Sequence, residues 1–141
     1  MLILDTNVVS ELMRPEPDAR VIAWMAAYPA TSLFLTTVTE AELRYGMTVL
    51  PPGRRRSRLT ESLESMLRDD FAQRILSFDR DAARDYAGIV AHRRQIGRPI
   101  AQFDAQIAAI ACARNAGVAT RNQADFSNCG IEAINPWDAP D

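Results

Sequence analysis

The stretch Met1-Leu2-Ile3-Leu4-Asp5-Thr6-Asn7 decides the fold class, because an apolar run passes directly into polar residues and then into a helical pattern. A short apolar run is typical of a strand buried on both faces of a parallel sheet. A helix that follows at once places Asp5 at the carboxyl end of that strand, where open α/β sheets build their sites. These polar residues also suit the ordinary capping of a helix start, and this stretch alone favours capping.

The rest of the chain alternates strand and helix patterns. Further apolar, β-favouring segments are expected as strands at residues 33–36, 75–78, 118–120 and 131–134. Apolar residues recur at helical spacing between them, and Gly117 is expected to end the helix before the fourth strand. This alternation predicts helices on both faces of a parallel sheet. We therefore expect an α/β fold, a three-layer α/β/α sandwich with a central parallel sheet of four to five strands, as a single domain over residues 1–141.

The composition excludes several classes of chemistry and of partner. All 16 basic residues are Arg, which rules out Schiff-base chemistry, a P-loop lysine and a lysine base, and the net charge of −2 gives no global attraction to nucleic acid. Cys112 and Cys129 lack metal-ligand spacing and are expected to be reduced thiols. No signal peptide is expected, and no apolar run approaches the ~20 residues of a membrane span. A cytoplasmic protein that does not bind membranes is expected.

Carboxylates recur at the expected strand exits and helix starts. These residues are Asp5, Glu42, Asp104 and Asp125. In a parallel sheet all four positions lie near one edge, where clustered carboxylates repel one another and raise one another's pKa. A hard cation among them relieves that repulsion. Oxygen ligands without His or Cys suit Mg²⁺ or Mn²⁺.

Each of these acids also has a purely structural interpretation. Asp104 near a helix start interacts favourably with the helix dipole. The segment Thr39-Glu40-Ala41-Glu42 matches a capping box, in which Glu42 folds back onto the Thr39 amide. Asp125 suits an ordinary turn. Spacing alone leaves the metal site and the structural interpretations both open.

A basic run and the single histidine complete the candidates. The run begins Arg54-Arg55-Arg56 at an expected helix start, where positive charge opposes the helix dipole. It can meet RNA phosphates or an acidic partner, or it can be a solvated surface patch. His92 precedes Arg93 and Arg94 at what we expect to be an exposed helix end, so we assign it no catalytic role.

Five segments, in order along nearly the whole chain, resemble the PIN domain and, more narrowly, the VapC/FitB-type ribonuclease toxins of bacterial toxin–antitoxin pairs. They are Leu-Asp-Thr-Asn at 4–7, Thr-Glu-Ala-Glu-Leu-Arg-Tyr-Gly at 39–46, Phe-Asp-Ala-Gln-Ile-Ala-Ala at 103–109, Thr-Arg-Asn-Gln-Ala-Asp-Phe at 120–126 and the closing Asn-Pro-Trp. Any one of these motifs is weak, but five in sequence are specific.

The resemblance implies roles for individual residues. The catalytic and metal-binding acids would be Asp5, Glu42, Asp104 and Asp125, with Asp5 and Asp104 as direct ligands of Mg²⁺, for which Mn²⁺ can substitute. The supporting polar residues would be Thr6, Asn7, Thr120 and Asn122. The candidate RNA-binding residues are Arg121, Arg54, Arg55 and Arg56. The family often has a fourth acid where Asn122 stands here, and Asp125 is taken as its substitute.

The resemblance also implies a function and partners. The expected function is metal-dependent hydrolysis of RNA phosphodiester bonds by the toxin of a toxin–antitoxin pair. The expected partners are RNA, a cognate antitoxin and a second copy in a homodimer, with DNA bound only through the antitoxin. One alternative is a PIN-fold module that binds RNA or protein without catalysis. A response-regulator receiver domain also clusters acids at a sheet edge, but it needs a lysine that this chain lacks.

Overall fold

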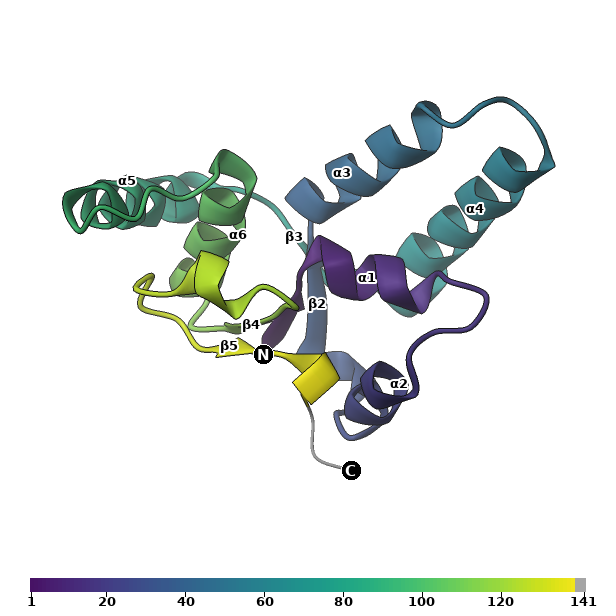
Figure 1. Cartoon of the computed structure of the whole chain (residues 1–141), viewed down its shortest axis with the longest axis horizontal. Helices are drawn as coiled ribbons and strands as arrows, with labels where there is room; N and C mark the ends of the chain where they lie inside the picture. Colours follow the sequence, from purple (N-terminus) through teal and green to yellow (C-terminus); the bar gives the residue numbers. More distant parts are fainter. Residues whose placement is uncertain (139–141) are drawn as a thin grey trace.

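The computed structural model describes residues 1–138, which form a parallel five-stranded sheet with helices on both faces (Figure 1). The strands are β1 (Leu2–Leu4), β2 (Leu33–Thr36), β3 (Ile75–Leu76), β4 (Gly117–Ala119) and β5 (Ala133–Ile134). Their order across the sheet is β3-β2-β1-β4-β5, and every neighbouring pair is parallel. The expected α/β fold with a parallel sheet is confirmed, and the N-terminal strand lies at the centre of the sheet.

Alternate residues of β1 enter two hydrophobic clusters, one on each face of the sheet. The helices are α1 (Thr6–Leu12), α2 (Ala19–Ala26), α3 (Thr37–Thr48), α4 (Arg54–Ser65), α5 (Arg80–Gln95) and α6 (Gln102–Ala113). Leu2 and Leu4 pack in the cluster that includes side chains of α1, α2 and α4. Ile3 packs in the cluster formed with α5 and α6. The sheet is therefore the middle layer of an α/β/α sandwich.

The carboxyl ends of β1 and β4 lie side by side. Leu4 pairs with Ala119, and the next amide along β1, that of Asp5, donates to the Ala119 carbonyl at 2.9 Å. Asp5 and Thr120 consequently leave the sheet together at one edge. The helices α1 and α3 both begin immediately after their strands, so their N-terminal ends lie at this same edge.

Gly117 does not end α6, contrary to our expectation. The helix ends at Ala113, and Asn115 adopts the left-handed conformation at φ 53° that lets the Ala116 amide donate to the Ala111 carbonyl. Gly117 instead begins β4, where a Cβ would lie 3.1 Å from the Leu2 side chain and 3.3 Å from the Glu132 carbonyl oxygen. This glycine serves close strand packing.

Other boundaries differ in length from the expectation. The third and fifth strands are only two residues long, shorter than the apolar runs at 75–78 and 131–134. The helix α4 begins at Arg54, so the basic run does occupy a helix start. Within residues 1–138, no helix combines the length and the apolar character that crossing a membrane requires.

Candidate active site

Asp5 is buried at the carboxyl end of β1 and also caps α1. Its carboxylate accepts hydrogen bonds from the Thr6 amide at 2.8 Å, from Thr120 Oγ1 at 2.8 Å and from Asn7 Nδ2 at 3.3 Å. Burial raises the pKa of Asp5, and the bonds from Thr120 and Thr6 oppose that rise. Capping and a place in the site are therefore compatible for this residue.

Asn7 and Thr120 tie the end of β4 to the start of α1. Asn7 Oδ1 accepts from the Arg121 amide at 3.2 Å, and its Nδ2 lies 3.4 Å from Thr120 Oγ1. Thr120 Oγ1 also accepts from the Asn122 amide at 3.1 Å. These contacts fix the backbone that leads to Asn122, whose exposed side chain lines the same cleft as Asp5.

Glu42 lies on α3 and receives a hydrogen bond from Thr6 Oγ1 at its Oε1, at 2.9 Å. The expected capping box at Thr39 is not formed, because Thr36 is the N-cap and accepts from the Thr39 amide at 3.1 Å. Thr39 is instead buried inside the helix, with its hydroxyl 3.0 Å from that of Thr6. The side chain of Glu42 is thus directed toward α1 rather than back onto its own helix start.

Asp104 is the third residue of α6 and is partly buried. Burial raises its pKa to about 6, and the charges of Asp5, Asp125 and Glu42 add to that rise, while Arg93 opposes it. The charges of the other three predicted acids therefore all act on Asp104. The N-terminal position of Asp104 in α6 also suits the helix dipole.

A cleft of about 610 Å³ is lined by all four acids, and its lining also includes Arg121 and Trp137. Asp125 reaches it from the 3₁₀ turn η3 (Gln123–Phe126). The Arg121 guanidinium carbon lies 4.9 Å from the centre of the Trp137 ring, and Trp137 is buried in the turn η4 (Pro136–Asp138). Carboxylates and guanidinium groups thus face a common space.

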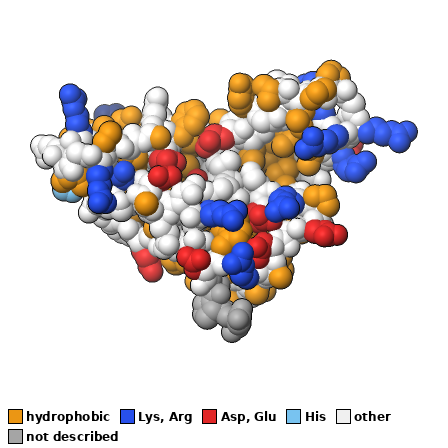
Figure 2. Space-filling view, viewed as in Figure 1, with side chains coloured by type: hydrophobic (Ala, Val, Ile, Leu, Met, Phe, Trp, Pro, Cys, Tyr) orange, Lys and Arg blue, Asp and Glu red, His pale blue; other side chains and the backbone are white. Residues whose placement is uncertain are grey.

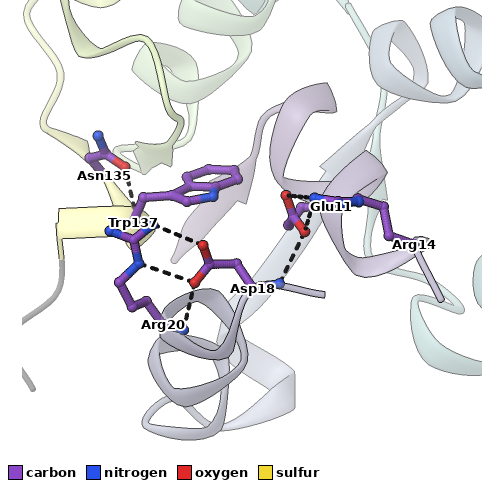
Figure 3. A network of polar contacts seen from close by, with 6 residues as sticks. All are labelled: Glu11, Arg14, Asp18, Arg20, Asn135 and Trp137. Carbon is purple, nitrogen blue, oxygen red and sulfur yellow. Dashed lines mark hydrogen bonds and ion pairs between the residues drawn. The ribbon is translucent and has the colours of Figure 1, made fainter. Parts of the chain in front are cut away.

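Glu11 and Arg14 also line this cleft and were missed from the sequence. Figure 3 shows the Glu11 carboxylate between the Arg14 guanidinium and the backbone amide of Asp18, and the Arg20 guanidinium binds the side-chain carboxylate of Asp18. Glu11 is buried, whereas the Arg14 side chain is 64% exposed. Glu11 follows Asn7 by one helical turn, so its place on the same face of α1 was the available signal.

The donor chemistry of the cleft fits a hard divalent cation, since its lining offers carboxylate, hydroxyl and amide oxygens and includes neither His nor Cys. Within residues 1–138, however, no three side chains of Asp, Glu, His or Cys are arranged closely enough to hold a metal ion. The residue types and their common cleft therefore suit a metal ion, but the carboxylates are not gathered into a tight group of ligands.

The structure does not bring the basic run to the cleft. Arg54, Arg55 and Arg56 begin α4, and Figure 2 shows basic side chains gathered at the far end of the α3–α4 arm. None of the three lines the acidic cleft. His92 is exposed, as expected, but Arg93 beside it is buried, which contradicts the idea that both belong to an exposed helix end. Cys112 and Cys129 are free thiols.

Comparison with known proteins gives matches over nearly the whole chain. The sequence pattern of the PIN domain matches residues 2–131. The chain is 45% identical to the plasmid stability protein StbB of Pseudomonas syringae pv. tomato (99% of this chain, 100% of the relative). It is 43% identical to the VapC ribonuclease Y4jK of Sinorhizobium fredii (98% and 99%), and 40% identical to the toxin FitB of Neisseria gonorrhoeae (97% and 99%).

Solved structures agree with the sequence matches. FitAcB from Neisseria gonorrhoeae superposes with a TM-score of 0.92 at 40% identity, covering 99% of this chain and 100% of that chain. FitAB bound to the IR36 DNA fragment superposes with a TM-score of 0.93 at 38% identity, covering 100% of this chain and 99% of that chain. The fold is thus shared with these proteins over nearly the whole chain.

Proposed function

The chain belongs to the PIN-domain family, and from that premise we propose that it is a metal-dependent endoribonuclease, the toxin of a toxin–antitoxin pair. The observation that carries this proposal is the single cleft in which Asp5, Glu42, Asp104 and Asp125 face Arg14 and Arg121. Relatives named a VapC ribonuclease and a toxin, at 43% and 40% identity, support the same activity.

Asp5 and Asp104 would hold a Mg²⁺ or Mn²⁺ ion directly, with Glu42 and Asp125 as ligands or as acceptors from its water shell. When bound, such an ion supplies Lewis acidity at a phosphate oxygen and lowers the pKa of water. Asp5 is fixed for this role by three hydrogen bonds, and Glu42 by the Thr6 hydroxyl. Among residues 1–138, the carboxylates of Asp104 and Asp125 accept no such hydrogen bonds, and we propose that they contribute negative charge.

The chain's own groups determine how the proton and the RNA are handled. The chain has no lysine, and His92 lies on α5 outside the cleft lining. Proton transfer in the cleft therefore falls to its carboxylates. Arg121, stacked on Trp137, and Arg14, held by Glu11, are placed to bind phosphates that flank the cleaved bond. An unpaired RNA loop is the preferred substrate, because its bases are exposed.

The deciding experiment is cleavage of structured RNA by the purified protein with Mn²⁺ or Mg²⁺, repeated in EDTA and with Asp5→Asn. Cleavage that requires both the cation and Asp5 supports the proposal. RNA binding without cleavage under every metal condition would instead support a PIN-fold binding module. Growth arrest on expression, lost with Asp5→Asn, tests the toxin role separately.

The partners we propose follow from the family. FitAB is a complex that binds a DNA fragment, so a cognate antitoxin is the expected partner, and DNA would be contacted through it. A homodimer is proposed as well from the family resemblance, and Tyr45, Val49 and Phe103, which are 70%, 58% and 52% exposed, are the apolar side chains proposed for its interface. Light scattering of the wild type and of Tyr45→Glu tests the dimer. With RNA as the proposed substrate and an antitoxin as the proposed partner, we propose that the protein acts in the cytoplasm.

A further inference from the structure

Arg93 is a buried charge that the proposed chemistry does not use. It lies in the last turn of α5 and is 5% exposed, whereas His92 and Arg94 on either side are exposed. Within residues 1–138 it forms no ion pair with a carboxylate; its partners are backbone carbonyls and one thiol. A guanidinium buried in this way needs hydrogen bonds to offset its desolvation.

Those hydrogen bonds join two separate segments. Arg93 Nε donates to the Arg98 carbonyl at 2.6 Å, in the connection to α6. Its Nη1 donates to the carbonyls of Asp125 and Ser127, each at 2.9 Å, and lies 3.7 Å from Cys129 Sγ. The donors of a guanidinium form a rigid planar fork, so one side chain fixes the spacing between the α5–α6 connection and the turn η3.

The two segments carry two of the four acids. The connection at Arg98 leads into α6, whose third residue is Asp104, and η3 carries Asp125. Within residues 1–138 the Asp125 carboxylate makes no hydrogen bond or ion pair. It is placed only by its backbone, whose amide donates to the Asn122 carbonyl at 3.0 Å and whose carbonyl accepts from Arg93.

We propose that Arg93 is a positioning residue, which sets the Asp125 carboxylate relative to Asp104 by clamping the backbone of η3 to the α5–α6 connection. The inference rests on the proposed function for its consequence, because the positioned group is a proposed ligand. It concerns a side chain that does not line the cleft and whose contacts are made with the backbone and with Cys129. Outer groups that orient ligands commonly change metal affinity or activity by about 10- to 100-fold when removed.

The test compares Arg93→Lys, which keeps the charge but loses the fork, with Arg93→Met and with Arg94→Met as the control in the same turn. Mn²⁺ binding is titrated by electron paramagnetic resonance on protein without RNA. Hydrogen exchange of the Asp125 and Ser127 amides is measured without metal. We expect Arg93→Lys to weaken Mn²⁺ binding by about tenfold and to speed hydrogen exchange in η3. Arg93→Met should weaken Mn²⁺ binding more and speed exchange more, whereas Arg94→Met should behave like wild type.

The double variant with Asp125→Asn identifies the route of the effect. If Arg93 acts through Asp125, adding Arg93→Lys to Asp125→Asn should not weaken Mn²⁺ binding further. A folded Arg93→Lys protein with wild-type Mn²⁺ affinity and wild-type exchange in η3 overturns the inference and leaves Arg93 a stability residue only. A wild type that binds no Mn²⁺ would refute the proposed function, whereas the exchange rates, which need no metal, still test the clamp.

Discussion

Thr6 Oγ1 donates a 2.9 Å hydrogen bond to Glu42 Oε1, which joins the first turn of α1 to α3 across 36 positions of sequence. The same hydroxyl lies 3.0 Å from that of Thr39. Since Asp5 immediately precedes Thr6 and caps the same helix, this contact places the first and second acids of the cleft relative to each other. Thr6 therefore contacts two of the proposed ligands, Asp5 through its backbone amide and Glu42 through its hydroxyl.

Replacing Thr6 with Val tests whether its hydrogen bond only stabilises the fold or also positions Glu42 for cleavage. The substitution keeps the branched shape but removes the hydroxyl, so Glu42 loses its donor. We expect a loss of about 1 kcal/mol of unfolding free energy, measured by urea denaturation, together with reduced cleavage. Thr37→Val is the control, because Thr37 is exposed at the corresponding first position of α3. Full cleavage by a folded Thr6→Val protein would contradict this role for the contact.

The raised pKa of Asp104 predicts how stability depends on pH. Its carboxyl has a pKa of about 6 in the fold against a reference of 3.8, so the native state holds the proton more tightly than the unfolded state does. The resulting stability is complete below pH 3.8 and is lost as the pH rises through about 6. Asp104→Asn stays neutral, so in EDTA its melting temperature should rise relative to wild type between about pH 4 and pH 7.5.

The same variant should lose cleavage at every pH, because the amide carries no charge for a cation. The alternative, in which Asp104 only interacts with the helix dipole, predicts a different result. A role in the helix dipole alone predicts that Asp104→Asn is less stable at neutral pH, by about 0.3–1 kcal/mol, while it still cleaves RNA.

Asp125 and Asn122 lie on one short turn and both line the cleft. If Asp125 replaces the acid that the family often carries at the position of Asn122, Asp125→Asn should lower cleavage by about 10- to 100-fold. Adding Asn122→Asp should restore part of it, measured as initial rates on one RNA. Gln123→Glu in the same background is the control and should restore nothing, because the Gln123 amide is bound to the Ala133 carbonyl. Equal rescue by both acids would show that only net charge matters.

The sequence predicted those features that depend on local patterns. The apolar run before Asp5 and the alternating elements predicted a buried parallel strand that ends at the site-bearing edge of the sheet, because burial on both faces leaves a continuous apolar signal. The strand order, which puts this strand at the centre, was not predicted. The interpretation of residues 39–42 as a capping box was wrong. Three threonines near the start of α3 are candidates for the N-cap, and Thr36, at the end of β2, occupies that position. Helical spacing alone does not decide among them.

Arg93 and Glu11 escaped prediction for a different reason. Arg93 follows the buried Ile89 by one helical turn, so its spacing fits the buried face, but its charge argued for exposure. Its acceptors are mostly carbonyls on a turn 32 or more positions away, and carbonyls leave no trace in a sequence. The Glu11 carboxylate likewise binds a backbone amide, that of Asp18.

Glu42 offers the sharpest test, because the structure separates it from Glu40 on the same helix. Glu42 lines the cleft and accepts from Thr6, whereas Glu40 pairs with Arg44 at 2.8 Å on the surface of α3. The amide oxygen of Gln can still accept the Thr6 bond, so Glu42→Gln should melt close to the wild-type temperature. It loses the negative charge that attracts a cation, so cleavage should fall by about 10- to 100-fold and growth inhibition should fall with it.

Glu40→Gln is the matched control for this prediction. It weakens an i,i+4 surface pair worth about 0.3–0.5 kcal/mol and should cleave RNA like wild type. Melting curves and initial rates on one RNA, measured for both variants in parallel, compare the two glutamates directly. Wild-type cleavage by Glu42→Gln with loss in Glu40→Gln would assign the site to the other glutamate. Wild-type cleavage by both would remove the α3 carboxylate from the site, and the Thr6 contact would then serve only to join α1 to α3.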